Sequence, residues 1–469
     1  MSHRHTAALV LFMVVLFAAY SPCFADAPNS ADAAPVVPGQ NSATSAQPAS
    51  SSTAAQGTGS PPCPTCPTAP APSDHSFFGR DILTDHFFGL GDKASEAGYT
   101  AHLSALQVYQ QVLGGGKPDE AHAGNYAGRY DVELNFNLGT ILGDKSGRIY
   151  ALGEGDWGGR GIQRQVGSIS NPNNNFQTPD EIFVRQLYFE QSLGGPNGDL
   201  LTFRVGKIDL TSCFQCAGCP TSFNGNRYIG DEESQFLNSA LGGGGTIPFP
   251  TQGPGAMAII RPLDWWYLSA GVENANAQQT ESSFDSTFSG NGRYFSVYET
   301  GVTPSISSCN GALPGAYRVG FWYDAQSLPR LDGPGNVHGN NGIYTSCDQK
   351  LWNPDDQNPL CGLAAFFRFD AAQADCIAVK TAYTTGLQYR GLIPGRKDDV
   401  LAVAYVSQRL ADGQNAGFTK ADESVIETYY NIKLTKWCSL SPDLQYVANP
   451  GGAGNNNATI IGLRLQILF

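Results

Sequence analysis

Three closely spaced cysteines carry the pattern most suggestive of chemistry. Cys213, Cys216 and Cys219 have the spacing of metal ligands. A structural zinc site takes four nitrogen or sulfur ligands, however, and no histidine follows at short range. Because Pro220 comes directly after Cys219, a c-type haem attachment motif is excluded. We favour disulfides in an exported chain, with a metal site as the alternative.

Residues suited to catalysis are sparse. Five of the seven histidines precede residue 110. A hydrolase would need His102 or His122 beside a serine, and no motif marks such a serine. The glycine runs 114–116 and 242–245 lack the lysine of a phosphate-binding loop. We therefore expect no enzyme activity, no cofactor and no metal.

Residues 1–25 predict a signal peptide that is cleaved on export. Arg4 and His5 precede the apolar run 7–19, and small residues lead to Ala25. The run is about 13 residues long, whereas a spanning helix needs roughly 20, so an uncleaved anchor is the weaker alternative.

The segment 26–75 is rich in Ala, Pro and Ser, and we expect it to be a disordered tail. Cys63 and Cys66 lie within it without the βαβ surroundings of a redox motif, so they favour a local disulfide or a cross-link. The domain that folds is therefore predicted to be 76–469.

Four later cysteines are also disulfide candidates in an exported chain. Cys361 with Cys376 is one possible pair, and Cys309 with Cys347 is another. The sequence does not determine the pairing.

The composition argues against a water-soluble protein. The net charge of −13, without a basic stripe, excludes a nucleic-acid partner. Only 15% of the residues are charged, against about 25% in a typical soluble chain. A transmembrane β-barrel explains this balance, because its strands hide apolar residues among polar ones and no long apolar run is needed.

Apolar and polar residues alternate along several segments, as they do in a strand with two different faces. Between Tyr130 and Leu138 the apolar residues alternate with Asp131, Glu133, Asn135 and Asn137. The same alternation recurs at 266–273, 317–324, 425–434 and 459–469.

Turn residues separate these strands. Short clusters lie at 143–147, 194–199 and 394–399, and longer Gly/Asn/Pro stretches at 158–180, 210–260, 274–292 and 325–362. Short turns that alternate with long loops are typical of outer-membrane barrels. A soluble β-sandwich is the alternative, but the polar faces carry few Lys and Glu residues.

The last strand is the most specific of these signals. Apolar residues alternate from Thr459 to the terminal Phe469. A barrel has no free edge, so its last strand must pair with its first. A terminal strand of this kind resembles the signal by which the bacterial barrel-assembly machinery recognises its clients.

Successive side chains of a strand face opposite sides, so odd or even position (the parity of the residue) assigns each side chain to lipid or to the lumen. Phe183, Leu187 and Phe189 are predicted to face lipid, which places Glu190 in the lumen. On the next strand, Arg204 faces the lumen and lies opposite Glu190. A cross-strand acid–base pair costs little free energy in a water-filled lumen, whereas the same pair facing lipid would be strongly destabilising.

The same parity gives a larger set of inward-facing candidates, in which Glu299 is expected to pair with Arg318. Such charges bind sugar hydroxyls, and aromatic rings pack against C–H faces; the alternative is that they only solvate the lumen. The candidates are Glu190, Arg204, Tyr267, Glu299, Arg318, Trp322, Arg368, Asp370, Arg390, Glu427, Asp443 and Arg464. Lys433 and the aromatic Tyr429 face the same way.

Several segments resemble one family, the OprB carbohydrate-selective porins. The longest are LPGAYRVGFWY at 313–323 and LSPDLQYVANPGG at 440–452; the others lie at 181–191, 203–209 and 389–396. They occur in the expected order over roughly 80–469. The tail and the many cysteines depart from the family pattern.

The resemblance implies an all-β fold, a transmembrane antiparallel barrel of about 16 strands with short periplasmic turns and long extracellular loops. It implies a bacterial outer-membrane porin through which small carbohydrates of monosaccharide type diffuse. The partners expected are these sugars, outer-membrane lipid and the barrel-assembly machinery acting on the strand that ends at Phe469. Homotrimer and monomer both remain open, and a structural or adhesive barrel is the alternative function.

Overall fold

The computed structural model describes a large part of the unit Pro67–Phe469. The predicted signal peptide and tail, together with Cys216 and Cys219, lie outside the described residues. The described ranges are 76–120, 124–143, 147–158, 161–174, 182–194, 200–214, 236–243, 246–277, 292–354, 358 and 360–469.

The described chain is dominated by strands. They are β1 (Tyr99–Gly116), β2 (Asn125–Asn137), β3 (Gly147–Trp157), β4 (Ile182–Leu193), β5 (Leu201–Ile208), β6 (Gly253–Leu263), β7 (Trp266–Asn274), β8 (Tyr294–Val302), β9 (Ser305–Ser308), β10 (Gly311–Pro329), β11 (Asn336–Trp352), β12 (Gly362–Ala372), β13 (Val379–Arg390), β14 (Val400–Leu410), β15 (Asp422–Thr435), β16 (Cys438–Ala448) and β17 (Asn456–Leu468).

The helices of the described ranges are short. They are α2 (Asp85–Phe88), α3 (Leu90–Glu96), α4 (Leu138–Leu142), α5 (Gln163–Val166), η1 (Leu210–Ser212), α6 (Ser239–Gly243) and η2 (Pro450–Gly452). Within the described part of the chain, none has the length and apolarity to cross a membrane.

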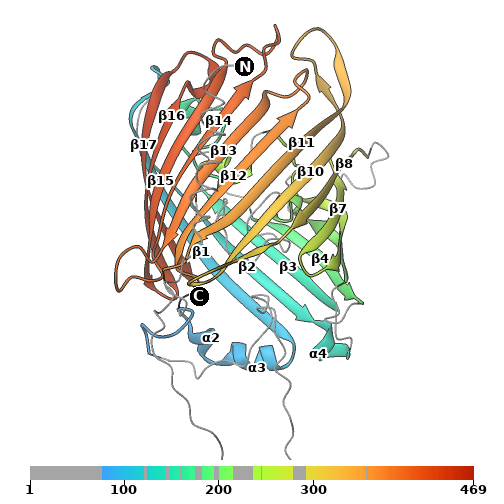
Figure 1. Cartoon of the computed structure of the whole chain (residues 1–469), viewed down its shortest axis with the longest axis vertical. Coiled ribbons are helices and arrows are strands. Elements are labelled where there is room, and N and C mark those ends of the chain that lie inside the picture. The colour runs from blue at the N-terminus through green and yellow to red at the C-terminus, as the bar shows by residue number, and fades with distance from the viewer. Residues whose placement is uncertain are drawn as a thin grey trace, which may run out of the picture. The chain divides into compact units, whose positions relative to one another are not determined.

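Sixteen of the strands close into an antiparallel barrel (Figure 1). Each pairs with its neighbour in sequence, except that β8 continues to β10 and the short β9 pairs only with the start of β10. The ring closes where β1 pairs with β17, in a register that sets Ser104 opposite Leu468. The predicted fold class and the predicted closure by the last strand are confirmed.

The strand connections differ between the two ends of the barrel, which we call the turn end and the loop end. At the turn end β6 and β7 are joined by residues 264–265, and β15 and β16 by residues 436–437. At the loop end the β3–β4 loop spans 158–181 and the β5–β6 loop spans 209–252.

One predicted loop is wrong. The stretch 325–362 contains the end of β10 and all of β11 rather than a long loop. Its Gly and Asn residues resemble turn residues, but they lie on strand faces. At Gly342 an added Cβ would lie 2.5 Å from the Trp322 ring, so glycine makes room for the tryptophan. Similarly, residues 253–260 of the predicted loop 210–260 belong to β6.

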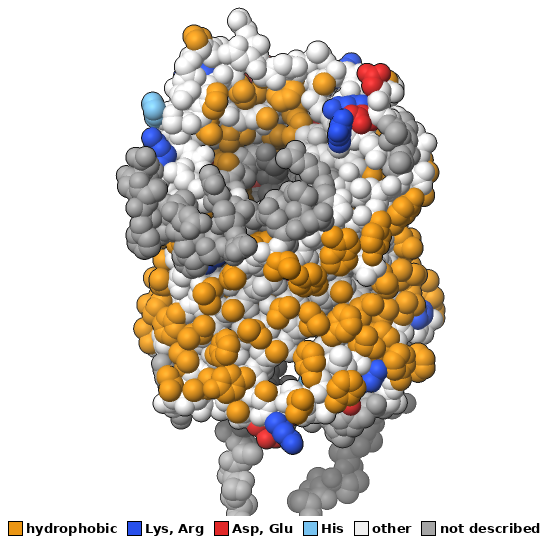
Figure 2. Space-filling model, turned by 180° about the vertical axis from the view of Figure 1, so that it is seen from behind, with side chains coloured by type: hydrophobic (Ala, Val, Ile, Leu, Met, Phe, Trp, Pro, Cys, Tyr) orange, Lys and Arg blue, Asp and Glu red, His pale blue; other side chains and the backbone are white. Residues whose placement is uncertain are grey.

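The outer face of the barrel is apolar. On the face drawn in Figure 2, hydrophobic side chains gather in a broad band across the wall, with few charged groups among them. Aromatic residues border this band, as is typical of membrane interfaces. Exposed examples towards the loop end are Tyr126, Tyr294, Tyr323 and Tyr446, and towards the turn end Tyr99, Trp265 and Trp352.

Segments of both long loops fold into the barrel. Ile162 and Val166 of the β3–β4 loop, and Phe236 and Leu241 of the β5–β6 loop, are fully or almost fully buried in one apolar cluster. The wall residues of that cluster come mainly from β12 and from β14 to β17. These loop segments therefore occupy part of the lumen.

Candidate pore-lining site

The inward-facing candidates lie where parity predicts, on the inner face. Arg204 is 9% exposed while the adjacent Val205 is 52% exposed, which separates the two faces of β5. Arg390 lies at the turn end and pairs with Asp398 at 2.8 Å. The candidates buried or largely covered inside are Glu190, Arg204, Tyr267, Glu299, Arg318, Trp322, Arg368, Asp370, Glu427, Asp443 and Arg464.

Glu190 and Arg204 lie directly opposite one another on β4 and β5, as the hairpin register predicts. Arg204 Nε donates to Glu190 Oε2 at 2.5 Å. The sequence reasoning missed the second partner, Arg148 of β3, whose Nε donates to Glu190 Oε1 at 2.6 Å. One carboxylate thus lies between two guanidinium groups from neighbouring strands.

Two tyrosines extend this cluster. Tyr150 and Tyr188 face each other across β3 and β4 with ring centroids 5.0 Å apart. The Arg204 guanidinium lies 5.0 Å from the centre of the Tyr188 ring, and the Arg148 guanidinium lies 5.8 Å from the centre of the Tyr150 ring. We call Arg148, Tyr150, Tyr188, Glu190 and Arg204 the arginine–tyrosine cluster.

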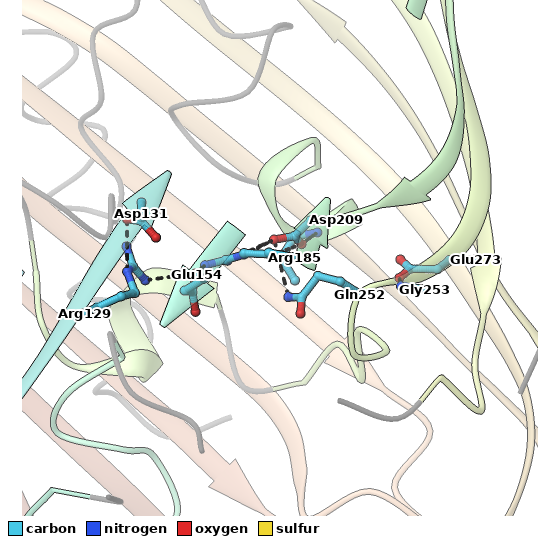
Figure 3. A network of polar contacts seen from close by, with 9 residues as sticks. Arg129, Asp131, Glu154, Arg185, Asp209, Gln252, Gly253 and Glu273 are labelled. Carbon is cyan, nitrogen blue, oxygen red and sulfur yellow. Dashed lines mark hydrogen bonds and ion pairs between the residues drawn. The ribbon is translucent and has the colours of Figure 1, made fainter. Parts of the chain in front are cut away.

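A second polar network, absent from the predicted set, follows the inner face of β2 to β5 (Figure 3). Arg129 contacts Asp131 at 3.2 Å and Glu154 at 3.8 Å. Arg185 contacts the same Glu154 at 2.6 Å and Asp209, just after β5, at 2.9 Å. Acidic and basic side chains therefore alternate across this wall.

A β-bulge explains why Arg185 was missed. Leu152 faces Gln186 and the next residue, Gly153, faces Val184, which leaves Arg185 as an extra residue on β4. A bulge shifts the parity of the strand beyond it. For the same reason Phe183, predicted to face lipid, is instead buried with 5% exposure, and that assignment is corrected.

The expected pair of Arg318 with Glu299 does not form. Arg318 contacts Asp348 of β11 at 2.9 Å instead. The register of β8 and β10 sets Gly301, not Glu299, opposite Arg318. Glu299 accepts hydrogen bonds from the hydroxyls of Tyr267 at 2.8 Å and Tyr344 at 2.7 Å.

Two of the candidates, Arg368 on β12 and Glu427 on β15, contact the inserted loops rather than open lumen. Arg368 Nη2 donates to the Leu241 carbonyl at 3.0 Å. Glu427 accepts a hydrogen bond from the backbone N–H of Asn238 at 2.9 Å. Sequence alone gives no signal for this, because the loop segments come from distant parts of the chain.

The two disulfide pairs considered above do not form. Cys347, Cys361 and Cys376 are free thiols, and Cys213 is a thiol as well, so the disulfide predicted at Cys213 does not form either. Cys361 and Cys376 lie at opposite ends of β12, roughly 35 Å apart at the rise of a strand, and a disulfide needs Cα atoms within about 7 Å. Cys309 precedes β10, whereas Cys347 faces Tyr317 well inside that strand.

The geometry is that of a barrel with a charged, aromatic inner wall, and comparison with known proteins identifies the family. Residues 121–469 match the family model described as "Carbohydrate-selective porin, OprB family". The chain belongs to the OprB family. It is a porin of the bacterial outer membrane, so its turn end faces the periplasm and its loop end the exterior.

Two relatives document the similarity. "Porin B" of Pseudomonas aeruginosa is 22% identical over 419 residues, which cover 80% of this chain and 88% of that protein. The high-pH structure of Pseudomonas putida OprB superposes with a TM-score of 0.71 at 19% identity, covering 83% of this chain and 98% of that one. The fold and the family are those of a channel rather than an enzyme.

Proposed function

We propose that this OprB-family porin lets small carbohydrates of monosaccharide type diffuse along the inner wall formed by β2 to β5. The observation that carries the proposal is that part of the arginine–tyrosine cluster keeps contact with the lumen. The Arg148 side chain retains 30% exposure, whereas Arg368 and Asp370 retain none. Side chains that meet a passing solute must keep some contact with lumen water.

The arginine–tyrosine cluster has the chemistry for this solute class. Guanidinium and carboxylate groups form paired hydrogen bonds with adjacent hydroxyls. Aromatic rings such as Tyr150 pack against the C–H face of a sugar. Because Glu190 lies between two arginines, the cluster presents donors and acceptors side by side and carries a net positive charge.

Conductance of the purified protein in planar bilayers tests this function. We expect open channels whose ion current falls when monosaccharides are added, because sugar in the passage displaces ions. A silent barrel would favour the alternative, a structural or adhesive protein. Open channels whose ion current no sugar reduces would contradict carbohydrate passage, although the porin fold would still stand.

The remaining assignments are part of the same proposal. We infer that the chain has no enzyme activity or cofactor, and glycosidase and esterase assays on the purified barrel test this against the hydrolase alternative. Residues 1–25 are proposed to be removed and 26–75 to form the tail of the mature chain, which N-terminal sequencing checks. Disulfides at Cys216, Cys219 and Cys309 stay a prediction for thiol alkylation and mass spectrometry.

The membrane environment supplies the other partners proposed. The apolar band and its aromatic borders suit outer-membrane lipid. Recognition by the barrel-assembly machinery is assigned to the strand ending at Phe469. Homotrimer and monomer are distinguished by the mass of the protein in mild detergent.

A further inference from the structure

Two glutamates on β15 face the lumen four residues apart, and each accepts backbone hydrogen bonds from a different inserted loop. Glu423 accepts the N–H groups of Ile169 at 2.9 Å and Ser170 at 3.2 Å, both in the β3–β4 loop, and that of Gly451, between β16 and β17, at 2.6 Å. Glu427 accepts the N–H groups of Leu237 at 2.5 Å and Asn238 at 2.9 Å, both in the β5–β6 loop. Both side chains are fully buried.

The two loop segments are also bonded to each other. Ser239 N donates to the Asn171 carbonyl at 2.9 Å, and Asn171 N donates to Ser239 Oγ at 2.8 Å. Asn174 N donates to the Leu237 carbonyl at 2.7 Å. Residues 161–174 and 236–243 therefore dock as one body, which we call the docked loop pair.

Further contacts attach the docked loop pair to the same wall. The Phe236 ring packs between Phe366, at 5.9 Å, and Tyr429, at 5.1 Å. Gln445 Nε2 donates to the Pro172 carbonyl at 2.9 Å. The polar groups that hold the pair are buried, and a buried hydrogen bond is costly to lose.

We propose that Glu423 and Glu427 are positioning residues that fix the width of the passage, and so the largest sugar that the porin admits. The inference rests on the diffusion path proposed above, since the docked loop pair fills the lumen beside that path, against β12, β14 to β17, β1 and the start of β2. A carboxylate oxygen holds an N–H group strongly, so losing one such bond shifts the ratio of docked to released loops roughly tenfold or more. When the loops are released, the channel is wider.

The variants are Glu423→Gln, Glu427→Gln and their combination. A glutamine has one acceptor oxygen, and its NH₂ group would face a backbone N–H, so at least one of the two bonds to the docked loop pair is lost at each site. Glu133→Gln is the control for hydrogen exchange and not for conductance, because Glu133 lies on the wall assigned to the diffusion path. It removes a carboxylate from the inner face of β2, where Glu133 accepts a hydrogen bond from Asn135 rather than from a loop.

Two measurements are needed, because the first does not depend on which solute passes. Hydrogen exchange of peptides covering 161–174 and 236–243 should speed up roughly tenfold or more in the variants, most in the double variant, and stay unchanged in Glu133→Gln. Channel conductance in polyethylene glycols of graded size should then show that the variants admit larger polymers than the parent.

Each outcome bears on the inference. Unchanged exchange and an unchanged size limit in the double variant would overturn it, and faster exchange with an unchanged size limit would overturn the link to passage width. If wild-type channels ignore sugars, the proposed function fails while exchange and polymer size still decide the loop anchoring. Should Glu427→Gln not assemble, Arg368→Met, which releases the Leu241 carbonyl, is expected to raise the size limit in its place.

Discussion

Glu190 has two arginine partners, so removing Glu190 should have a different effect on the protein from removing Arg204. Without Arg204, the carboxylate keeps Arg148 at 2.6 Å, so little buried charge is left uncompensated. Without Glu190, two guanidinium groups face each other with no anion between them. Parity predicted that both residues face the lumen, but it gave no information about Arg148, which comes from a third strand.

We expect Arg204→Ala to lower the free energy of unfolding by about 1 kcal/mol, and Glu190→Ala by about 3 kcal/mol, because it leaves a largely covered like-charge pair. Arg204→Ala should shift ion selectivity towards cations, and Glu190→Ala towards anions. Reversal potentials across a salt gradient measure both shifts. Unchanged selectivity in folded channels of normal conductance would mean that this cluster does not line the conducting path.

The closing seam is an element that the sequence predicted well. Alternation up to Phe469 implied that the last strand pairs with the first, and β17 does pair with β1. The Phe469 N–H donates to the Leu103 carbonyl at 2.8 Å, so the final residue takes part in the closure.

Deletion of Phe469 should therefore reduce the amount of folded barrel in the outer membrane severely while leaving export intact. It removes the last hydrogen bond of the seam and the terminal aromatic of the assembly signal. Heat-modifiable mobility on gels, with periplasmic levels as the control, gives the readout. Wild-type amounts of folded barrel would show that closure and recognition do not depend on this residue.

The periplasmic turn between β13 and β14 contains a carboxylate with several donors. Asp399 accepts hydrogen bonds from the Arg396 guanidinium, the Tyr430 hydroxyl and the Lys433 N–H, each at 2.8 to 2.9 Å. Burial alone would raise the pKa of Asp399, but these donors outweigh it and hold the pKa below its usual value. The turn thus fastens β14 to β15.

Because the pKa of Asp399 is lowered by folding, its contribution to stability is present above the unfolded pKa of about 3.9 and is lost as the pH falls through the folded pKa. Asp399→Asn should lower the free energy of unfolding by about 1.5 to 3 kcal/mol at pH 7. The difference from wild type should shrink below about pH 4. Unfolding in denaturant at pH 7 and pH 3 tests this, and an equal difference at both values would contradict it.

The sequence predicted an element wrongly where its local residue pattern conflicts with the tertiary contacts that the element makes. The bulge in β4 turns Phe183 inward and brings Arg185 into the polar network of Figure 3. No residue type in this stretch predicts a bulge. The Gly and Asn residues of β11 resembled a loop because a lumen wall tolerates them beside large rings such as Trp322.

At the scale of the whole molecule, the period-two pattern and the closing strand predicted the barrel. The same pattern did not predict which part of the inner wall is open. Arg368, Glu427 and Trp322 were all correctly assigned inward, yet they are covered, two of them by loops that arrive from far along the chain. Parity is a local property, whereas access to the lumen depends on how the loops fold.

The way the loops are held has a consequence for how such a channel can diversify. Glu423 and Glu427 accept hydrogen bonds from main-chain N–H groups, which every amino acid except proline carries. Pro172, which lacks an N–H, is held by its carbonyl instead. Loop side chains outside the apolar cluster can thus change without breaking these bonds, so new solute preferences can evolve, or be engineered, by changing those side chains on an unchanged wall.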